Sequence, residues 1–297
     1  MKSVDWRSPR RFPTLHAMNR FLVTMCLFLA TAWASEAAAR PRELIMIQVG
    51  NENVAATEAD LGSFGRLLDL RQKNKPGTTK TRLFTDPEAA EEYIRKKRPA
   101  MALLPPFEFA RLAKPGALEP VGVGVSVKGP QTYYWGVARR DARLDLNLHR
   151  RPGLRLALPL GFDVQWVNVL MDGLVDTESH FKIVTVPDVT SGIKAVVEKR
   201  ADIVFVSDLK HVELAPRFRK DANDLEDVYQ SPELPLMTLV TFKNAFNKKE
   251  RDAFLGVLDS VCVGETIELC ARLGFLELRA GLLRMHPHLA YKYQHYK

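Results

Sequence analysis

Residues 86–112 read DPEAAEEYIRKKRPAMALLPPFEFARL, and residues 188–214 repeat the pattern as DVTSGIKAVVEKRADIVFVSDLKHVEL. The two segments align without a gap, so that Asp86 pairs with Asp188. In each copy the aspartate precedes an amphipathic helix that ends in basic residues. This order suits a helix because a carboxylate accepts the free amide hydrogens at its start and cations complement its negative end. A short apolar strand and a second helix complete each unit, so two copies predict two similar lobes with a cleft between them.

Strands and helices alternate along the rest of the chain. Strands are predicted at 43–49, 79–84, 118–127, 132–139, 154–158, 181–186 and 227–243, and helices at 56–74, 161–174, 247–263 and 265–283, followed by a polar, aromatic tail over 286–297. This alternation predicts an α/β protein with mixed, mainly parallel sheets and helices on both faces of each sheet.

The lengths of these segments predict how the chain divides into lobes. Residues 40–135 and 237–297 are expected to form lobe one, and residues 136–236 to form lobe two. Two strands, Tyr133–Val137 and Leu236–Phe242, would cross between the lobes and act as a hinge. Because the chain passes twice, the lobes can move against each other without drifting apart.

Residues 1–39 have the pattern of a secretory signal peptide. An arginine precedes the apolar run Phe21–Trp33, and A-x-A sequences follow at 32–34 and 37–39. Met18 would give a compact signal and is a candidate for the true start. We therefore predict a soluble exported protein, most simply in a bacterial periplasm. A buried helix and a retained membrane anchor stay open, although a spanning helix needs about 20 apolar residues and this run is shorter.

The charge distribution argues against a nucleic-acid partner. Removal of residues 1–39 lowers the formal net charge from +8 to about +5, and the basic residues are spread along the chain. Nucleic-acid-binding proteins carry clustered basic residues instead. A mild positive charge is compatible with an anionic ligand or with a solvated surface. The processed chain is long enough to bury a large core, and we expect a monomer without a cofactor.

Two cysteines, Cys262 and Cys270, remain after export, and an oxidising compartment would let them pair. On one continuous helix, eight rises of about 1.5 Å exceed the reach of a disulfide. Gly264 lies between them and could end one helix so that a second folds back. The sequence therefore leaves a disulfide open.

Four segments carry a resemblance to a known family. The segments YIRKKRPAMALLPPFEFARL (93–112) and ADIVFVSDL (201–209) are similar to strands that end at a ligand cleft. YWGVARRDARLDLNL (134–148) and residues 239–261 are similar to the two strands that cross between lobes. In element order the chain resembles the type II periplasmic binding proteins of ABC transporters, specifically their phosphate/phosphite/phosphonate-binding (PhnD-like) branch. The resemblance implies a two-lobed fold, a small ligand between the lobes and an ABC permease in the inner membrane as partner.

One segment departs from that branch. The family holds its oxyanion partly with a Ser/Thr-Ser-Gly turn at a helix start, where this chain reads LPLGFDV (158–164) without a hydroxyl group. The turn of lobe one, Leu104–Phe107, is equally poor in hydrogen-bond donors. Backbone amides at a helix N-terminus can bind an anion, but Asp163 would repel it. Three alternatives stay open: an oxyanion, a less charged, more apolar or cationic ligand, or a cleft that has lost binding.

Ligands of α/β proteins bind beyond the carboxyl ends of the strands. This rule and the proposed crossing strand select eight candidate ligand-binding residues: Asn51, Pro106, Phe107, Tyr134, Phe162, Asp163, Ser207 and Asp208. The Phe107 ring could stack on a ligand or pack the lobes together. Ser207 and Asp208 could bond a ligand's hydroxyl or amine, or cap the helix that follows. Residues 190–192 superficially resemble an anion-binding turn, but their position after Asp188 fits ordinary capping.

No catalytic or metal-binding motif is recognisable. The sequence lacks a nucleophile elbow, a phosphate loop, a zinc-spaced cysteine set and an HExxH segment, and His286, His288 and His295 alone would make a poor metal site. The leading hypothesis is a binding protein that delivers a solute to a permease. The alternatives are a ligand-sensing or partner-binding module with a degenerate pocket, and an enzyme resembling those of the menaquinone pathway with Asp163 or Asp208 as base.

Overall fold

The computed structural model describes residues 42–49, 53–113, 117–144, 148–208, 211, 225–281 and 285–296. The predicted signal peptide, residues 1–39, lies outside the described residues. Within these ranges, no helix combines the length and the hydropathy that crossing a membrane requires.

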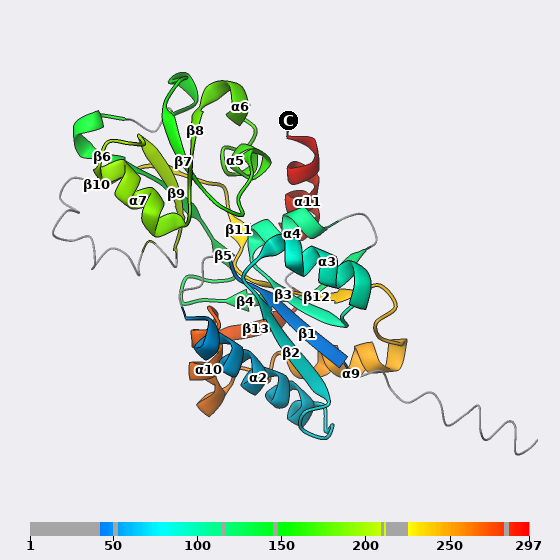
Figure 1. Cartoon of the computed structure of the whole chain (residues 1–297). Helices are drawn as coiled ribbons and strands as arrows, with labels where there is room; N and C mark the ends of the chain where they lie inside the picture. Colours follow the sequence, from blue (N-terminus) through cyan, green and yellow to red (C-terminus); the bar gives the residue numbers. More distant parts are fainter. Residues whose placement is uncertain are drawn as a thin grey trace, which may run out of the picture. The chain divides into compact units, whose positions relative to one another are not determined.

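Strands and helices alternate over the described chain (Figure 1). The strands are β1 (Arg42–Ile47), β2 (Thr79–Phe84), β3 (Met101–Leu104), β4 (Leu118–Val125), β5 (Gln131–Thr132), β6 (Tyr134–Arg139), β7 (Arg155–Pro159), β8 (Lys182–Val186), β9 (Ile203–Ser207), β10 (Leu225–Gln230), β11 (Leu234–Pro235), β12 (Thr238–Phe242) and β13 (Glu277–Ala280). The helices are α2 (Val54–Arg71), α3 (Pro87–Lys97), α4 (Pro106–Leu112), α5 (Val164–Leu170), α6 (Thr177–His180), α7 (Val189–Val197), α9 (Lys248–Leu258), α10 (Ile267–Arg272) and α11 (Met285–His295).

Two mixed sheets share one topology. The six-stranded sheet has the order β13-β4-β12-β3-β1-β2, and the five-stranded sheet has the order β10-β6-β9-β7-β8. In each sheet a first strand, β1 or β7, lies between two parallel neighbours. On one side of this group an antiparallel strand follows: β12 pairs with β3, and β6 pairs with β9. Both sheets therefore contain the same four-stranded arrangement, as the repeated sequence predicts.

The two copies of the repeat fold alike. The Asp86 carboxylate accepts a hydrogen bond from the Glu88 backbone N–H at 2.9 Å and caps α3. The Asp188 carboxylate accepts one from the Ser191 N–H at 2.7 Å and caps α7. Each helix leads into a buried strand, β3 or β9. The second helix of the first copy is α4, whereas most of 209–214 lies outside the described residues.

A short ribbon connects the sheets where the sequence predicted two crossing strands. β5 pairs with β11 antiparallel, with Thr132 opposite Leu234, and this ribbon lies between the two sheets in Figure 1. β6 belongs wholly to the five-stranded sheet, and β12 belongs wholly to the six-stranded sheet. The chain thus passes between the sheets at the β5–β11 ribbon. The crossing points lie a few residues before β6 and β12, not within these two strands.

Two C-terminal predictions were wrong. Residues 277–280 are predicted as helix, but they form β13, which pairs antiparallel with β4; Gly274, with a positive φ of +97°, lies between α10 and β13. Residues 286–297 are predicted as a tail, but α11 covers most of them. Leu289 and Tyr293, one helical turn apart, are 3% and 8% exposed. This buried stripe packs α11 against α4 and α5, which is why the segment folds.

The apolar core extends through both sheets. One hydrophobic cluster contains Ile47 and Leu104 from the six-stranded sheet together with Phe205 from the five-stranded sheet. Elsewhere in the six-stranded part, Cys262 and Cys270 form a disulfide with a Cα–Cα distance of 5.9 Å. α9 ends at Leu258, before Cys262, and α10 begins at Ile267, between the two cysteines, so no continuous helix joins them.

Candidate functional site

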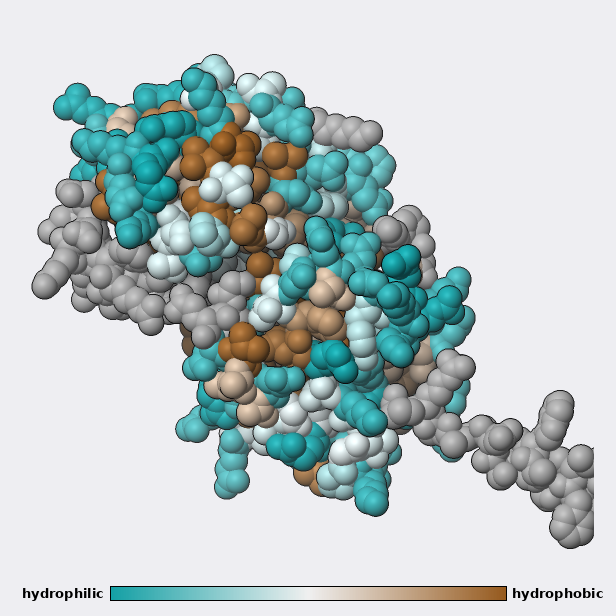
Figure 2. Space-filling view, in the orientation of Figure 1, coloured by the Kyte–Doolittle hydropathy of each residue, from teal (hydrophilic) through white to brown (hydrophobic). Residues whose placement is uncertain are grey.

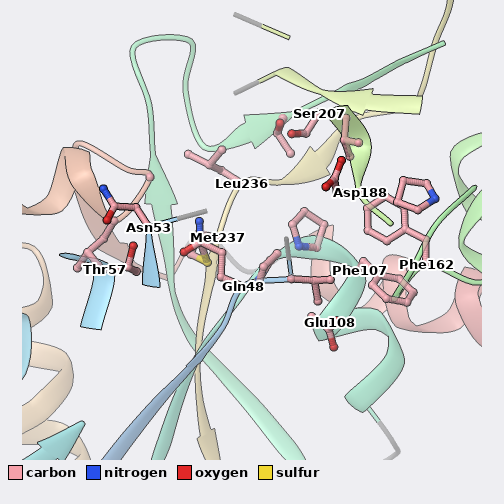
Figure 3. A pocket seen from close by; sticks show the side chains of 18 of the residues that line it. Gln48, Asn53, Thr57, Phe107, Glu108, Phe162, Asp188, Ser207, Leu236 and Met237 are labelled. Atoms are coloured by element: carbon pink, nitrogen blue, oxygen red, sulfur yellow. The ribbon is translucent and has the colours of Figure 1, made fainter. Parts of the chain in front are cut away.

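The described residues enclose a cavity of about 740 Å³. Its walls come from the carboxyl ends of strands in both sheets: Gln48 and Val49 follow β1, Pro105 follows β3, Asp188 follows β8, and Ser207 ends β9. The first turn of α2 adds residues on the far side (Figure 3). The cavity therefore lies where the strand-end rule places ligands in α/β proteins.

Five of the eight predicted site residues line this cavity: Pro106, Phe107, Tyr134, Phe162 and Ser207. Asp163 and Asp208 are not among the lining residues. Asn51 lies outside the described residues. The structure thus brings together the apolar part of the predicted set and leaves its two carboxylates elsewhere.

Both of those carboxylates bind other parts of the chain. Asp163 caps α5 by accepting the Trp166 N–H at 2.8 Å, and it also accepts the phenolic hydrogen of Tyr293. Asp208 is 8% exposed and accepts the Trp135 indole N–H at 2.6 Å. Lys128 lies 3.3 Å from the same carboxylate. Residues distant in sequence therefore donate hydrogen bonds to both carboxylates, and no local sequence motif predicts these contacts.

Aromatic side chains form one wall of the cavity. The Phe107 ring, from α4, lies 5.2 Å from Phe162 and 5.4 Å from Trp166, between ring centroids. Tyr134 packs edge-on against Trp166 at 5.6 Å. Phe107 therefore lines the cavity and packs the two sheets together, which is one of the two roles weighed from the sequence, while stacking on a ligand stays a prediction. In Figure 2, apolar residues gather toward the middle of the view and hydrophilic ones toward its outer ends.

Polar groups that the sequence did not single out complete the lining. Gln48, Asn53 and Thr57 approach from β1 and α2, opposite Asp188 and Phe162 in Figure 3. Asp188, which the sequence predicts only as a helix cap, both caps α7 and lines the cavity. The sequence signal for this second role was its place two residues after the end of β8.

The one basic side chain among the lining residues is already paired. Arg272, on α10, donates to both oxygens of Asp60 on α2, at 2.9 and 3.0 Å. The two residues lie 212 positions apart, so sequence spacing gives no hint of the pair. This double hydrogen bond holds α10 against α2 and neutralises the arginine within the wall.

A buried acid lies at the aromatic wall. Glu108 is 2% exposed and accepts hydrogen bonds from Arg111 at 2.8 and 3.1 Å. Its other oxygen, Oε1, is buried and has no hydrogen-bond partner within the described part of the chain. Burial raises the pKa of this carboxyl above its ordinary value, although Arg111 acts in the opposite direction. Glu108 therefore adds no positive charge to this side of the cavity.

Backbone and side chain approach closely at the turn after β7. Gly161 has a positive φ of +93°, and a Cβ atom placed there would lie 2.9 Å from Val49 Cγ1. Val49 belongs to the six-stranded part and Gly161 to the five-stranded part, so glycine permits a close contact at the cavity edge.

Among the described residues, no group of three or more His, Cys, Asp or Glu side chains could hold a metal ion. His286 is buried, with its Nε2 2.8 Å from the Thr238 hydroxyl oxygen.

Comparison with known proteins identifies the fold. No protein-family model and no curated protein matches this chain. Among solved structures, XAC2383 from Xanthomonas citri, bound to chloride ion, has a TM-score of 0.69 at 14% identity, covering 86% of this chain and 98% of its own. A binding protein component of an ABC phosphonate transporter from Pseudomonas aeruginosa has a TM-score of 0.63 at 15% identity, covering 86% and 88%.

PhnD1 from Prochlorococcus marinus, in complex with methylphosphonate, has a TM-score of 0.64 at 12% identity, covering 85% of this chain and 97% of its own. These likenesses, together with the two matching sheets, show that the chain has the two-lobed type II periplasmic-binding-protein fold. The fold class predicted from the sequence is therefore confirmed.

Proposed function

We propose that this protein is an exported solute-binding protein that holds a small ligand between its lobes and delivers it to an ABC permease in the inner membrane. The observation that carries the proposal is the cavity of about 740 Å³ at the carboxyl ends of strands from both sheets. A volume in this range suits a small molecule. The export signal expected in residues 1–39 gives the periplasm as the site of action.

The connection between the sheets supports a closing motion. The β5–β11 ribbon pairs two residues from each passage of the chain, so few backbone hydrogen bonds would resist bending there. A ligand that contacts both walls stabilises the closed state by its differential affinity for that state. The permease would then recognise the closed conformation of the protein.

The contacts of the predicted acids favour binding over catalysis. The enzymatic alternative needs Asp163 or Asp208 as a base, but each accepts hydrogen bonds from other parts of the chain and lies outside the cavity lining. A sensing module with a degenerate pocket is the second candidate, favoured by the missing hydroxyls at 158–164. The volume of the cavity supports retained binding instead.

Titration calorimetry on the protein purified from a bacterial periplasm tests the proposal, with phosphonates, phosphite, sulfonates, amines and amino acids as ligands. We expect micromolar or tighter binding of at least one compound. Ala56→Trp, which adds bulk at an exposed residue that lines the cavity, should abolish that binding with unchanged thermal stability. Ala59→Trp, one turn further along the exposed face of α2, is the matched control and should bind normally. Absence of heat with every compound would argue for the sensing module.

A further inference from the structure

We infer that the ligand carries a protonated amine or another cationic group, and that Asp188 is the side chain that selects it. The inference rests on the proposed function and names the ligand class of that cavity. It follows from the charges of the lining, the free capacity of the Asp188 carboxylate and the aromatic wall.

The lining offers no unpaired positive side chain within the described residues. Its charged members are Asp60, Glu108, Asp188 and Arg272, and Arg272 already donates to both oxygens of Asp60. Glu108 shares Arg111, which also pairs with Glu91 at 2.9 Å. Among the described residues, an anion that loses water in this cavity would meet no unpaired cation to compensate it, and desolvation of an uncompensated charge is costly. A cation would meet the Asp188 carboxylate, which pairs with no arginine or lysine among the described residues.

Asp188 has remaining capacity to accept hydrogen bonds. Its Oδ1 accepts the Ser191 N–H at 2.7 Å, and no other partner of the carboxylate occurs among the described residues. The side chain is partly exposed and lies between Ser207 and Phe162 on one side of the cavity in Figure 3. Asp86, its counterpart in the repeat, also caps a helix but does not line the cavity. The capping aspartate of the second repeat therefore also lines the cavity, whereas the capping aspartate of the first repeat does not.

The neighbouring rings suit the same ligand group. Phe107 and Phe162 line the cavity with their centroids 5.2 Å apart at an angle of 67°. Aromatic faces attract ammonium groups because the ring quadrupole places negative charge on the face. A cavity lined by the Asp188 carboxylate and two aromatic rings therefore favours an organic cation over an inorganic anion.

The opposite wall accommodates the rest of such a molecule. α2 begins at Val54 with no side-chain cap and no acidic residue in its first turn, and Asn53 and Thr57 line the cavity there. The positive end of the helix dipole favours a carbonyl, carboxylate or phosphonate group. A zwitterion with its amine at Asp188 therefore fits both walls, whereas a simple oxyanion leaves Asp188 facing a like charge or nothing.

Matched ligands and matched variants test the inference. Wild-type protein is titrated with pairs that differ by one amine: 2-aminoethylphosphonate and ethylphosphonate, taurine and ethanesulfonate, 4-aminobutyrate and butyrate. We expect the amine member of at least one pair to bind more than tenfold tighter. Asp188→Asn should remove most of that preference, because asparagine keeps the helix cap but lacks the charge. Asp86→Asn makes the same change at the equivalent cap outside the cavity and should change nothing.

The outcomes separate the inference from the proposed function. Equal or tighter binding of the amine-free members would overturn the inference and leave solute binding intact. An amine preference that persists in a folded Asp188→Asn variant would overturn the role of Asp188. If no compound in the pairs or in the wider panel binds the wild-type protein, both the inference and the proposed function fail.

Discussion

The Tyr293 hydroxyl donates a hydrogen bond to Asp163, a residue 130 positions earlier. Tyr293 lies on α11, and Asp163 caps α5, so the bond ties the last helix of the chain to the five-stranded lobe. α11 also packs against α4 of the other lobe. Burial, and then the hydrogen bond to Asp163, raise the pKa of this phenol above its ordinary value. α11 therefore spans both lobes beside the aromatic wall of the cavity.

Replacing Tyr293 by Phe should destabilise the protein by about 1–2 kcal/mol. The ring would still pack on Phe107, 6.1 Å away between centroids, so the loss isolates the hydrogen bond and the unpaired Asp163 oxygen. Urea unfolding followed by circular dichroism measures the change. Tyr291→Phe is the control, since Tyr291 lies on the same helix and is 60% exposed. Equal stability of the two variants would show that the bond contributes little.

The fold could be predicted because its signals are local and repeated. Asp86 and Asp188 each start a helix, and the apolar runs that follow become β3 and β9. The wrong predictions concern segments whose secondary structure depends on tertiary contacts. Residues 277–280 form a strand because β4 offers an edge, and the polar segment after His286 is a helix because Leu289 and Tyr293 find apolar neighbours.

The site could be predicted only in part for the same reason. The strand-end rule selected Phe107, Phe162 and Ser207, which line the cavity because each lies at or shortly after the end of a strand. It also selected Asp163 and Asp208, because a sequence does not reveal that Tyr293 and Trp135 occupy them. The sequence did not predict the lining residues of α2 and α10, because these helices line the cavity only once the lobe has folded.

The Cys262–Cys270 disulfide should stabilise the protein modestly. Closing a loop of this length is worth about 2–3 kcal/mol on the chain-entropy account, and both residues are buried at 2% and 0% exposure. We expect C262S/C270S to lower the urea midpoint. Dithiothreitol should lower the wild-type midpoint to the same value and leave the variant unchanged. A wild-type midpoint that is insensitive to the reductant would contradict the prediction.

A pH-dependent contribution is expected from Asp202. The Arg155 guanidinium and backbone N–H donate to it at 2.7–3.1 Å, and the guanidinium hydrogen bond holds its pKa below the ordinary value. The folded state therefore binds fewer protons than the unfolded state in acid. The stabilisation is full above the unfolded pKa of about 3.9 and is lost as pH falls through the lower folded value.

Asp202→Asn should thus cost about 1–2 kcal/mol at neutral pH, and its gap to the wild type should narrow as pH falls below about 4. Urea unfolding at a series of pH values measures this. Asp141→Asn is the control, because Asp141 pairs with Arg139 at 2.8 Å but is 60% exposed, so its effect should be smaller. A gap for Asp202→Asn that stays constant down to acid pH would sink the prediction.

Alanine substitutions at Gly161 and Gly153 distinguish the effect of backbone strain from the effect of contact between the lobes. Their φ angles are similar, +93° and +86°, but a Cβ at Gly161 would lie 2.9 Å from Val49, whereas one at Gly153 would meet nothing within 4 Å. Alanine at either position should therefore cost roughly 1–2 kcal/mol of stability from the left-handed backbone. Only Gly161→Ala should also push the turn after β7 away from Val49.

Because both Val49 and the residue before Gly161, Leu160, line the cavity, that displacement should hinder closure on a ligand. We expect Gly161→Ala to bind the best compound from the titration panel at least tenfold more weakly, about 1.4 kcal/mol, while Gly153→Ala binds as the wild type does. Calorimetry gives the affinities, and small-angle scattering with saturating ligand should show a larger radius of gyration for Gly161→Ala alone. If both variants bind normally, closure does not bring Val49 against this turn, and the ligand is held by a more open pair of walls.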